Sequence, residues 1–287
     1  MLCVEGRVAL AAFISFAVLS LYQVRILCAD YWSYEYCLLV FITAVSCTFA
    51  LPYSGIVKRA GFLGTIFGGA LVLIYFTVFP WKLLCVFLVA LSFFHFSEYL
   101  LTAIYNEHTL NLSSFLINHS VEYQLAVVLS VSEFVVETLL LPSLKHFFLI
   151  NFVGFILVLG GELLRKVSMV TAKSNFTHIV QDEKKESHIL VTSGVYAWSR
   201  HPSYVGWFYW SIGTQIMLCN PICTVLYCYA SWKFFYDRIR DEEFYLFKFF
   251  GKDYIDYVEK VPTRIPFANG LYDELKPFMA KSKETHK

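Results

Sequence analysis

Long apolar runs, separated by short polar or proline-containing breaks, dominate the hydrophobic pattern of this chain. We distinguish eight of them, at residues 8–24, 36–51, 62–79, 82–104, 121–140, 147–166, 204–219 and 222–236. Leu, Val, Phe and Ile prevail in these runs, and a bilayer core needs about 20 such residues per helix. Sharp breaks follow at prolines, which turn a chain cheaply at a helix end. The pattern predicts an all-α integral membrane protein with about eight transmembrane helices.

Composition supports this class of protein and limits the kinds of binding partner that we expect. The chain is 57% hydrophobic and only 16% charged, and its mean hydropathy is +0.57. A net charge of +1 without a basic patch gives no reason to expect a nucleic-acid partner. The eight cysteines form no C-x-x-C pair, so we interpret them as small buried residues and expect no metal. Membrane lipid is the expected environment.

Basic residues indicate how the helices are oriented. If both termini are cytosolic, the loops on the far side contain only Arg25, Lys82 and Lys145 of the 23 basic residues. Loops that stay in the cytosol are enriched in Lys and Arg, so this distribution predicts cytosolic N- and C-termini.

The stretch before the last apolar hairpin contains an Arg-His-Pro triplet, Arg200–Pro202. Pro202 suits the first position of a helix, and the N–H groups of Ser203, Tyr204 and Val205 would then be free. A helix N-terminus of this kind binds anions, so a carboxylate or phosphate is a candidate ligand, with hydrogen bonds from His201 and Ser203. Ordinary helix capping at a membrane entry is the alternative.

The last apolar run continues into a charged helix. Arg238 and Glu242 lie one turn apart there and share a face. An arginine suits a carboxylate because its planar fork binds both oxygens, and an acid suits hydroxyl or ammonium groups. A surface ion pair of little energetic value is the alternative.

Ionisable residues also occur inside the apolar runs, at His95, Glu98, Glu133 and Glu137. Charges in lipid are costly, so each must face a partner or a wet cavity. A structural pairing and a place in the lining of a substrate cavity both remain open.

Two long segments resemble one enzyme family. They are SGVYAWSRHPSYVGWFYWSIGTQ (193–215) and DEEFYLFKFFGKDYIDYVEKVPTRIPF (241–267), and FLINHSVEY (115–123) also fits. Together they resemble the isoprenylcysteine carboxyl methyltransferases of the endoplasmic reticulum, over most of the chain from about residue 90. The Arg-His-Pro-x-Tyr element is shared with phospholipid N-methyltransferases and, more loosely, with sterol reductases. Its combination with the C-terminal E-E…F-G-x-x-Y…V-P-x-x-x-P pattern is specific.

The resemblance implies methyl transfer from S-adenosylmethionine, which leaves S-adenosylhomocysteine, to the α-carboxylate of a farnesylated or geranylgeranylated C-terminal cysteine in C-a-a-X proteins. It implies a multi-pass protein of the endoplasmic reticulum membrane with a cytosolic active site. Arg238 would bind the substrate, and Arg238 and Glu242 would be the catalytic residues. The cofactor-binding residues would be Gln181, His188, Ile189, Leu190, Val191, Tyr196, His201, Pro202, Ser203, Tyr204 and Glu242.

The resemblance also suggests a division of the chain. Residues 1–166 would form a transmembrane scaffold, residues 167–267 the catalytic region with a transmembrane hairpin at 203–238, and residues 268–287 a tail. No G-x-G-x-x-G follows a strand pattern, so no Rossmann domain is expected, and the cofactor site should lie on the cytosolic side of the C-terminal region.

Three other functions remain to be compared with this one. A reductase using NADPH needs basic residues for the 2′-phosphate, whereas the segment 241–243 is acidic. A phospholipid N-methyltransferase would bind an amine, against which Arg238 argues. In a channel or receptor, the polar loop before the hairpin would only bind partners.

Overall fold

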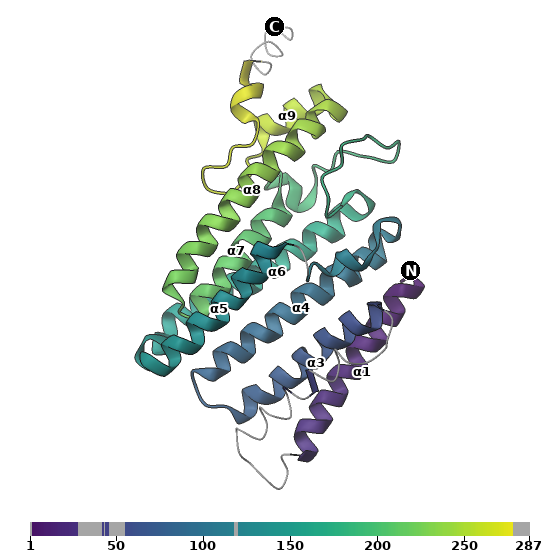
Figure 1. The fold of residues 1–287 in the computed structure, drawn as a ribbon. Coiled ribbons are helices and arrows are strands. Elements are labelled where there is room, and N and C mark those ends of the chain that lie inside the picture. The colour runs from purple at the N-terminus through teal and green to yellow at the C-terminus, as the bar shows by residue number, and fades with distance from the viewer. Residues whose placement is uncertain (1, 28–41, 43, 46–54, 118–119, 278–287) are drawn as a thin grey trace. The chain divides into compact units, whose positions relative to one another are not determined.

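The computed structural model describes residues 2–27, 42, 44–45, 55–117 and 120–277. Within this part the chain is helical and contains no strand, as predicted (Figure 1). The α-helices are α1 (Val4–Leu27), α3 (Gly55–Phe76), α4 (Trp81–Tyr105), α5 (Val121–Leu140), α6 (Phe148–Ala172), α7 (Pro202–Met217), α8 (Pro221–Phe250) and α9 (Lys252–Lys260). Short 3-10 turns lie at Glu107–Thr109, Leu112–Phe115, Pro142–His146, Lys173–Asn175 and Gly194–Ala197.

Seven of the eight predicted apolar runs correspond to helices of the described part, and the run 36–51 lies almost entirely outside it. Five helices there are long and apolar enough to cross a membrane, namely α1, α3, α4, α5 and α6. Because α7 has only 16 residues and α8 becomes charged along its length, the predicted count of eight transmembrane helices is not confirmed.

The sixth apolar run, 147–166, corresponds to a longer helix. Helix α6 continues to Ala172, because Met169 and Ala172 extend its buried face beyond the charged residues at 165 and 166. The polar connection to α7 is correspondingly shorter.

Contacts divide the chain into two compact units, Met1–Gly154 with Thr214–Cys223, and Phe155–Gly213 with Thr224–Lys287. These units follow packing, whereas the boundaries predicted at 166 and 267 concern function and stay predictions.

The first unit is held together by close contacts among α1, α3 and α4. Phe13 of α1 stacks on Phe96 of α4, with ring centroids 3.9 Å apart, and Ala9 and Ala60 are completely buried. Lipid is as apolar as these side chains, so helices in a membrane gain stability from close packing of small residues rather than from water exclusion. The alanines and stacked rings meet that requirement.

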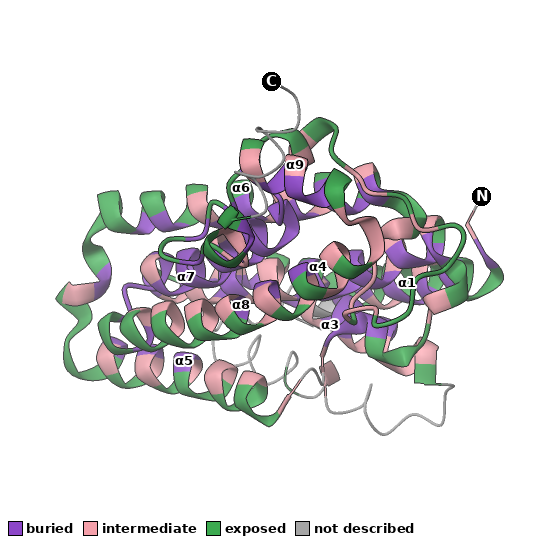
Figure 2. Ribbon diagram, turned by 90° about the horizontal axis from the view of Figure 1, so that it is seen from above, coloured by how far each residue is buried: buried purple, intermediate pink, exposed green. Residues whose placement is uncertain are grey.

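Apolar side chains also cover the outside of these helices. On α5, Val121 and Leu140 are 77% and 73% exposed, and exposed positions dominate that helix in Figure 2. Such a surface would be unfavourable in water, whereas lipid chains cover it in a membrane. The chain is therefore a multi-pass membrane protein.

A buried lysine fastens the turn between α7 and α8 within the first unit. The Nζ atom of Lys145 has no exposure and lies 2.6 Å from an Oε2 of Glu137. It also donates to the carbonyl oxygens of Leu218 at 3.1 Å and Cys219 at 2.9 Å, and to the Asn220 side chain at 2.9 Å. Removing one partner of a buried pair costs about 3–5 kcal/mol, because the other charge is left unpaired.

Glu133 acts on the same turn. Its two carboxylate oxygens each accept a backbone N–H, from Ile222 and Cys223, at 2.7 Å. A carboxylate at a helix N-terminus satisfies orphan donors and complements the helix dipole. Glu133 and Glu137 therefore share a face in order to hold the hairpin, which answers the question left by the sequence in favour of structural pairing.

His95 has a comparable structural environment. Its Nδ1 lies 2.8 Å from the carbonyl oxygen of Phe115, and its Nε2 lies 2.9 Å from the hydroxyl of Tyr123. Glu98, one turn further along α4, is fully buried. The histidine thus joins α4 to the start of α5.

Candidate active site

In the second unit, glycines let α6 and α7 approach each other very closely. A Cβ atom at Gly161 would lie 2.5 Å from the carbonyl oxygen of Gly206 and 2.6 Å from the backbone nitrogen of Trp210. No side chain fits at these distances, so the crossing requires glycine. It brings the backbone of α6 directly against the first turns of α7.

Arg165 occupies the space that this crossing creates. It is only 2% exposed, its Nη1 donates to the carbonyl oxygen of Ser203 at 3.3 Å, and its guanidinium lies 4.6 Å from the centre of the Trp207 ring. Stacking on an aromatic face stabilises a desolvated cation. Arg165 thereby stabilises the first turn of α7.

Helix α7 begins at Pro202, as predicted, but the expected free N–H groups are mostly absent. The backbone nitrogens of Tyr204 and Val205 both donate to the carbonyl oxygen of His201, at 3.0 and 3.1 Å. His201 closes the first turn with its own carbonyl group, which the sequence argument did not consider. The expectation that the N–H groups of Tyr204 and Val205 are free was therefore wrong, and the anion site at the start of α7 stays a prediction.

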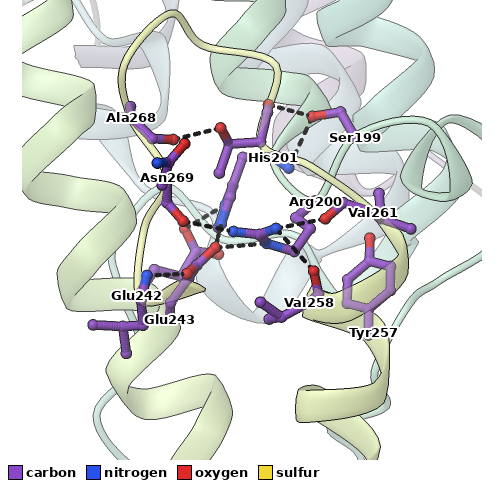
Figure 3. Close-up of polar contacts among 12 residues, drawn as sticks. Ser199, Arg200, His201, Glu242, Glu243, Tyr257, Val258, Val261, Ala268 and Asn269 are labelled. Atoms are coloured by element: carbon purple, nitrogen blue, oxygen red, sulfur yellow. Dashed lines mark hydrogen bonds and ion pairs between the residues drawn. The ribbon is translucent and has the colours of Figure 1, made fainter. Parts of the chain in front are cut away.

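A buried ionic cluster fixes the Arg-His-Pro triplet to α8 (Figure 3). One oxygen of Glu243 lies 2.8 Å from Nε of Arg200 and 2.9 Å from Nε2 of His201. The other oxygen accepts the backbone N–H of Leu271 at 2.6 Å. The Glu243 side chain has no exposure, so every one of these bonds forms away from water.

The partners of Glu243 determine its ionisation. Burial alone would raise its pKa, but hydrogen bonding to His201 and the nearby charges of His201 and Arg200 outweigh burial and lower the pKa from 4.5 to about 2. The carboxylate is therefore ionised at neutral pH.

Residues after α9 also form hydrogen bonds with this ionic cluster. Arg200 donates from Nη2 to the carbonyl oxygen of Asn269 at 3.0 Å and from Nη1 to that of Val261. Leu275 is 3% exposed and packs in a cluster with residues of α9. Residues 268–275, assigned to a tail in the sequence analysis, thus pack against the triplet and α9.

Glu242, adjacent to Glu243, faces a different environment. It lines an open cavity of about 650 Å³, solvent at the mouth included. Its Oε2 lies 3.7 Å from Nδ1 of His201, is buried, and accepts no hydrogen bond from the described residues. A buried carboxylate oxygen without a donor is costly, so it is suited to a ligand that supplies one.

Most of the predicted cofactor residues line the cavity. Its lining includes Ile189, Leu190, Val191, Tyr196, His201, Ser203, Tyr204 and Glu242, together with Phe176, Arg200 and Tyr257 among others. The rings of His201 and Tyr204 stack in parallel with centroids 5.5 Å apart. Burial raises the pKa values of Tyr196 and Tyr257, so both phenols stay protonated at neutral pH.

Arg238 does not line this cavity but is joined to it by Tyr204. Nε of Arg238 donates to the Tyr204 hydroxyl at 2.9 Å, and its guanidinium also donates to the carbonyl oxygen of His178. Tyr204 therefore connects Arg238 to the cavity that Glu242 lines.

Three predicted cofactor residues are not part of the cavity lining. Gln181 donates to the nearby carbonyl oxygen of Ile179 at 3.1 Å, and Pro202 starts α7. His188 lines a second open cavity, and partial burial and the charges of Lys185 and Lys184 lower its pKa.

The sequence argument missed Glu243, although the sequence contains a signal for it. Adjacent residues on a helix point about 100° apart, so Glu242 and Glu243 point in different directions. The second carboxylate must then be buried or exposed elsewhere, and a buried one requires a cation. Arg200, in the triplet itself, is that cation.

Comparison with known proteins gives a consistent picture. Residues 153–248 match the model of the isoprenylcysteine carboxyl methyltransferase family. The chain is 53% identical over 238 residues to the protein-S-isoprenylcysteine O-methyltransferase of Xenopus laevis, covering 82% of each. It is 51% identical over 224 residues to that of Homo sapiens, covering 78% of each.

The fold has a counterpart among solved structures. The eukaryotic intramembrane Ras methyltransferase, an isoprenylcysteine carboxyl methyltransferase, superimposes with a TM-score of 0.85 at 38% identity, over 94% of this chain and 99% of that one. Family model, sequence relatives and fold agree, and the chain belongs to the isoprenylcysteine carboxyl methyltransferase family.

Proposed function

We propose that this protein esterifies the α-carboxylate of a C-terminal prenylcysteine, with S-adenosylmethionine as the methyl donor. Family membership supports the reaction class. The observation that supports the site is Glu242, which lines the cavity and whose buried Oε2 accepts no hydrogen bond from the described residues.

The cavity suits a donor that is partly polar and partly apolar. Its apolar wall at Ile189, Leu190 and Val191 can cover a flat ring, and Glu242 can accept from ribose hydroxyl or ammonium groups. When bound, S-adenosylmethionine supplies an electrophilic methyl carbon.

Arg238 is proposed to bind and orient the acceptor carboxylate. That carboxylate is ionised at neutral pH, so the enzyme needs no general base. Of the five N–H donors of the guanidinium, Tyr204 and His178 receive one each, which leaves donors for the substrate. Catalysis then consists of alignment and exclusion of water, and well-oriented reactants gain about 7–11 kcal/mol over free ones.

The surroundings of the site indicate where each reactant enters. A farnesyl or geranylgeranyl chain requires an apolar route, and we propose that it enters sideways from lipid between helices. The donor enters from water through the open cavity. The distribution of Lys and Arg supports a cytosolic location for that side, and the family resemblance supports the endoplasmic reticulum as the membrane.

A radiolabelled-methyl assay with the purified protein tests the proposal. Farnesylcysteine should be methylated and phosphatidylethanolamine should not. Arg238→Ala should reduce transfer by at least about 30-fold, since truncating one partner of a buried charge pair costs about 2–5 kcal/mol, yet retain donor binding by calorimetry. Arg240→Ala is the matched control, because the ion pair of Arg240 with Glu274 is exposed and Arg240 does not line the cavity. Methylation of the phospholipid, or equal loss of activity and donor binding in Arg238→Ala, would contradict the proposal.

A further inference from the structure

The loop Arg264–Phe267, between α9 and the C-terminal residues, presents a bulky apolar side chain to its surroundings. Phe267 is 90% exposed, the most of any large hydrophobic residue in the described chain. Arg264 and Phe267 both have left-handed backbone conformations, with φ of 68° and 57°. That conformation is unfavourable for a bulky residue, so the loop needs contacts that hold it.

The loop is nevertheless firmly attached to the Arg-His-Pro segment. The carbonyl oxygen of Pro262 accepts the backbone N–H of Arg200 at 3.1 Å, and that of Thr263 accepts from the Ser199 hydroxyl at 2.6 Å. The Thr263 hydroxyl donates to the carbonyl oxygen of Ala268, which closes the loop (Figure 3). These bonds fix the conformation in which Phe267 points away from the protein.

A tryptophan on α8 indicates the depth of the loop relative to the membrane. Nε1 of Trp232 donates to the carbonyl oxygen of Pro266 at 2.8 Å. Residues 221–232 of α8 carry no charge, whereas Lys233 and Asp237 follow at once. Trp232 therefore stands where α8 passes from hydrocarbon to water, the level that tryptophan and tyrosine prefer in membrane proteins.

Arg264, in the same loop, also has surroundings that are typical of the membrane–water interface. The guanidinium of Arg264 lies 5.3 Å from the centre of the Trp198 ring, and its Nε donates to the carbonyl oxygen of Trp198 at 3.2 Å. Trp198 itself is 47% exposed. An arginine stacked on an interfacial tryptophan is typical of the headgroup region, where apolar surface and charge are both accommodated.

We propose that the loop Arg264–Phe267 is an interfacial membrane anchor whose Phe267 inserts among the lipid chains of the adjacent leaflet. Lipid supplies the contacts that the exposed phenyl ring lacks within the protein. Because Pro262 and Thr263, directly before the loop, accept hydrogen bonds from Arg200 and Ser199, the anchor also holds the segment before α7 at the headgroup level. The anchor requires only that the chain spans a membrane and does not depend on the reaction catalysed.

Hydroxyl-radical footprinting of the unmodified protein in phosphatidylcholine nanodiscs tests this. Phe244, about 18 Å further along α8 than Trp232, is the matched control and is 55% exposed. In water, Phe267 should be oxidised more than Phe244, in line with their exposures. With the anchor inserted, the order inverts and Phe267 is protected like Tyr229, a 67% exposed residue of the apolar part of α8. Oxidation of Phe267 equal to or above that of Phe244 overturns the proposal.

Quenching by lipid provides an independent measurement. An environment-sensitive fluorescent amino acid is placed at position 267, 244 or 229, one per variant, in nanodiscs of acyl-brominated phosphatidylcholine. We expect strong quenching at positions 267 and 229 and weak quenching at 244. Quenching at 267 as weak as at 244 shows that the loop lies in water, and the anchor is then refuted.

Discussion

The two adjacent glutamates of α8 allow a sharp test, because the structure gives them opposite roles. Glu243→Gln keeps the shape of the side chain but removes the charge that Arg200 and His201 share. Glu242→Gln makes the same change on a residue that faces the cavity and is 31% exposed. We expect the first substitution to lower stability and the second to lower donor affinity.

Two estimates give the size of the stability loss. A pKa that moves from 4.5 to about 2 on folding corresponds to about 3 kcal/mol in favour of the ionised folded protein. Breaking a buried ion pair from one side costs about 3–5 kcal/mol. For a chain of this size, about 3 kcal/mol lowers the Tm by roughly 6–12 °C.

Acid dependence gives a second readout of the same carboxylate. Its folded pKa is depressed, so its contribution is complete above pH about 4.5 and is lost as pH falls toward about 2. The Tm of the wild type should therefore fall over that range, and Glu243→Gln should show a shallower fall.

Thermal unfolding in detergent at neutral pH, followed by intrinsic fluorescence, measures both variants. Calorimetric titration with the donor then separates stability from binding. If Glu243→Gln lowers the Tm no more than Glu242→Gln does, the ionic cluster does not stabilise the fold and the reasoning fails.

Two further substitutions test how the helices are held together. Lys145→Met should lower stability by about 3–5 kcal/mol, because it strands buried acceptors at the hairpin turn, whereas Lys233→Met, at an exposed surface pair, should cost less than about 1 kcal/mol; equal Tm values would rule out the role of Lys145. Gly161→Ala should force α6 and α7 apart and reduce both the Tm and methyl transfer, because its Cβ would lie 2.5 Å from the carbonyl oxygen of Gly206. The adjacent Gly160→Ala meets nothing within 4 Å and should be neutral in both assays, so similar behaviour of the two variants would contradict the close crossing.

The hydrophobic pattern of the sequence predicted the helices, because a helix depends mainly on residues that are close together in the chain. The apolar runs gave the helices, and Pro202 marked the start of α7 because its preference for a first helical turn is intrinsic. Helix α6 extends beyond the apolar run that ends at residue 166, since charged residues can remain helical when aromatic rings cover them, as Trp207 covers Arg165.

Contacts between distant residues lie beyond such reasoning. Arg200 and Glu243 are 43 residues apart, and Lys145 bonds to carbonyl oxygens more than 70 residues away. No periodicity links these positions, because packing alone brings them together. The sequence therefore pointed to the half of the site with recognisable residues, and only the structure shows what holds that half in place.

The position of Tyr204 links the binding of one reactant to the binding of the other. Its ring forms part of the cavity wall, while its hydroxyl accepts a hydrogen bond from Arg238. A ligand that shifts or immobilises this ring on one side changes the freedom of the guanidinium on the other, and thermodynamic linkage makes that effect equal in both directions. We therefore expect the two reactants to bind cooperatively, each raising the affinity for the other.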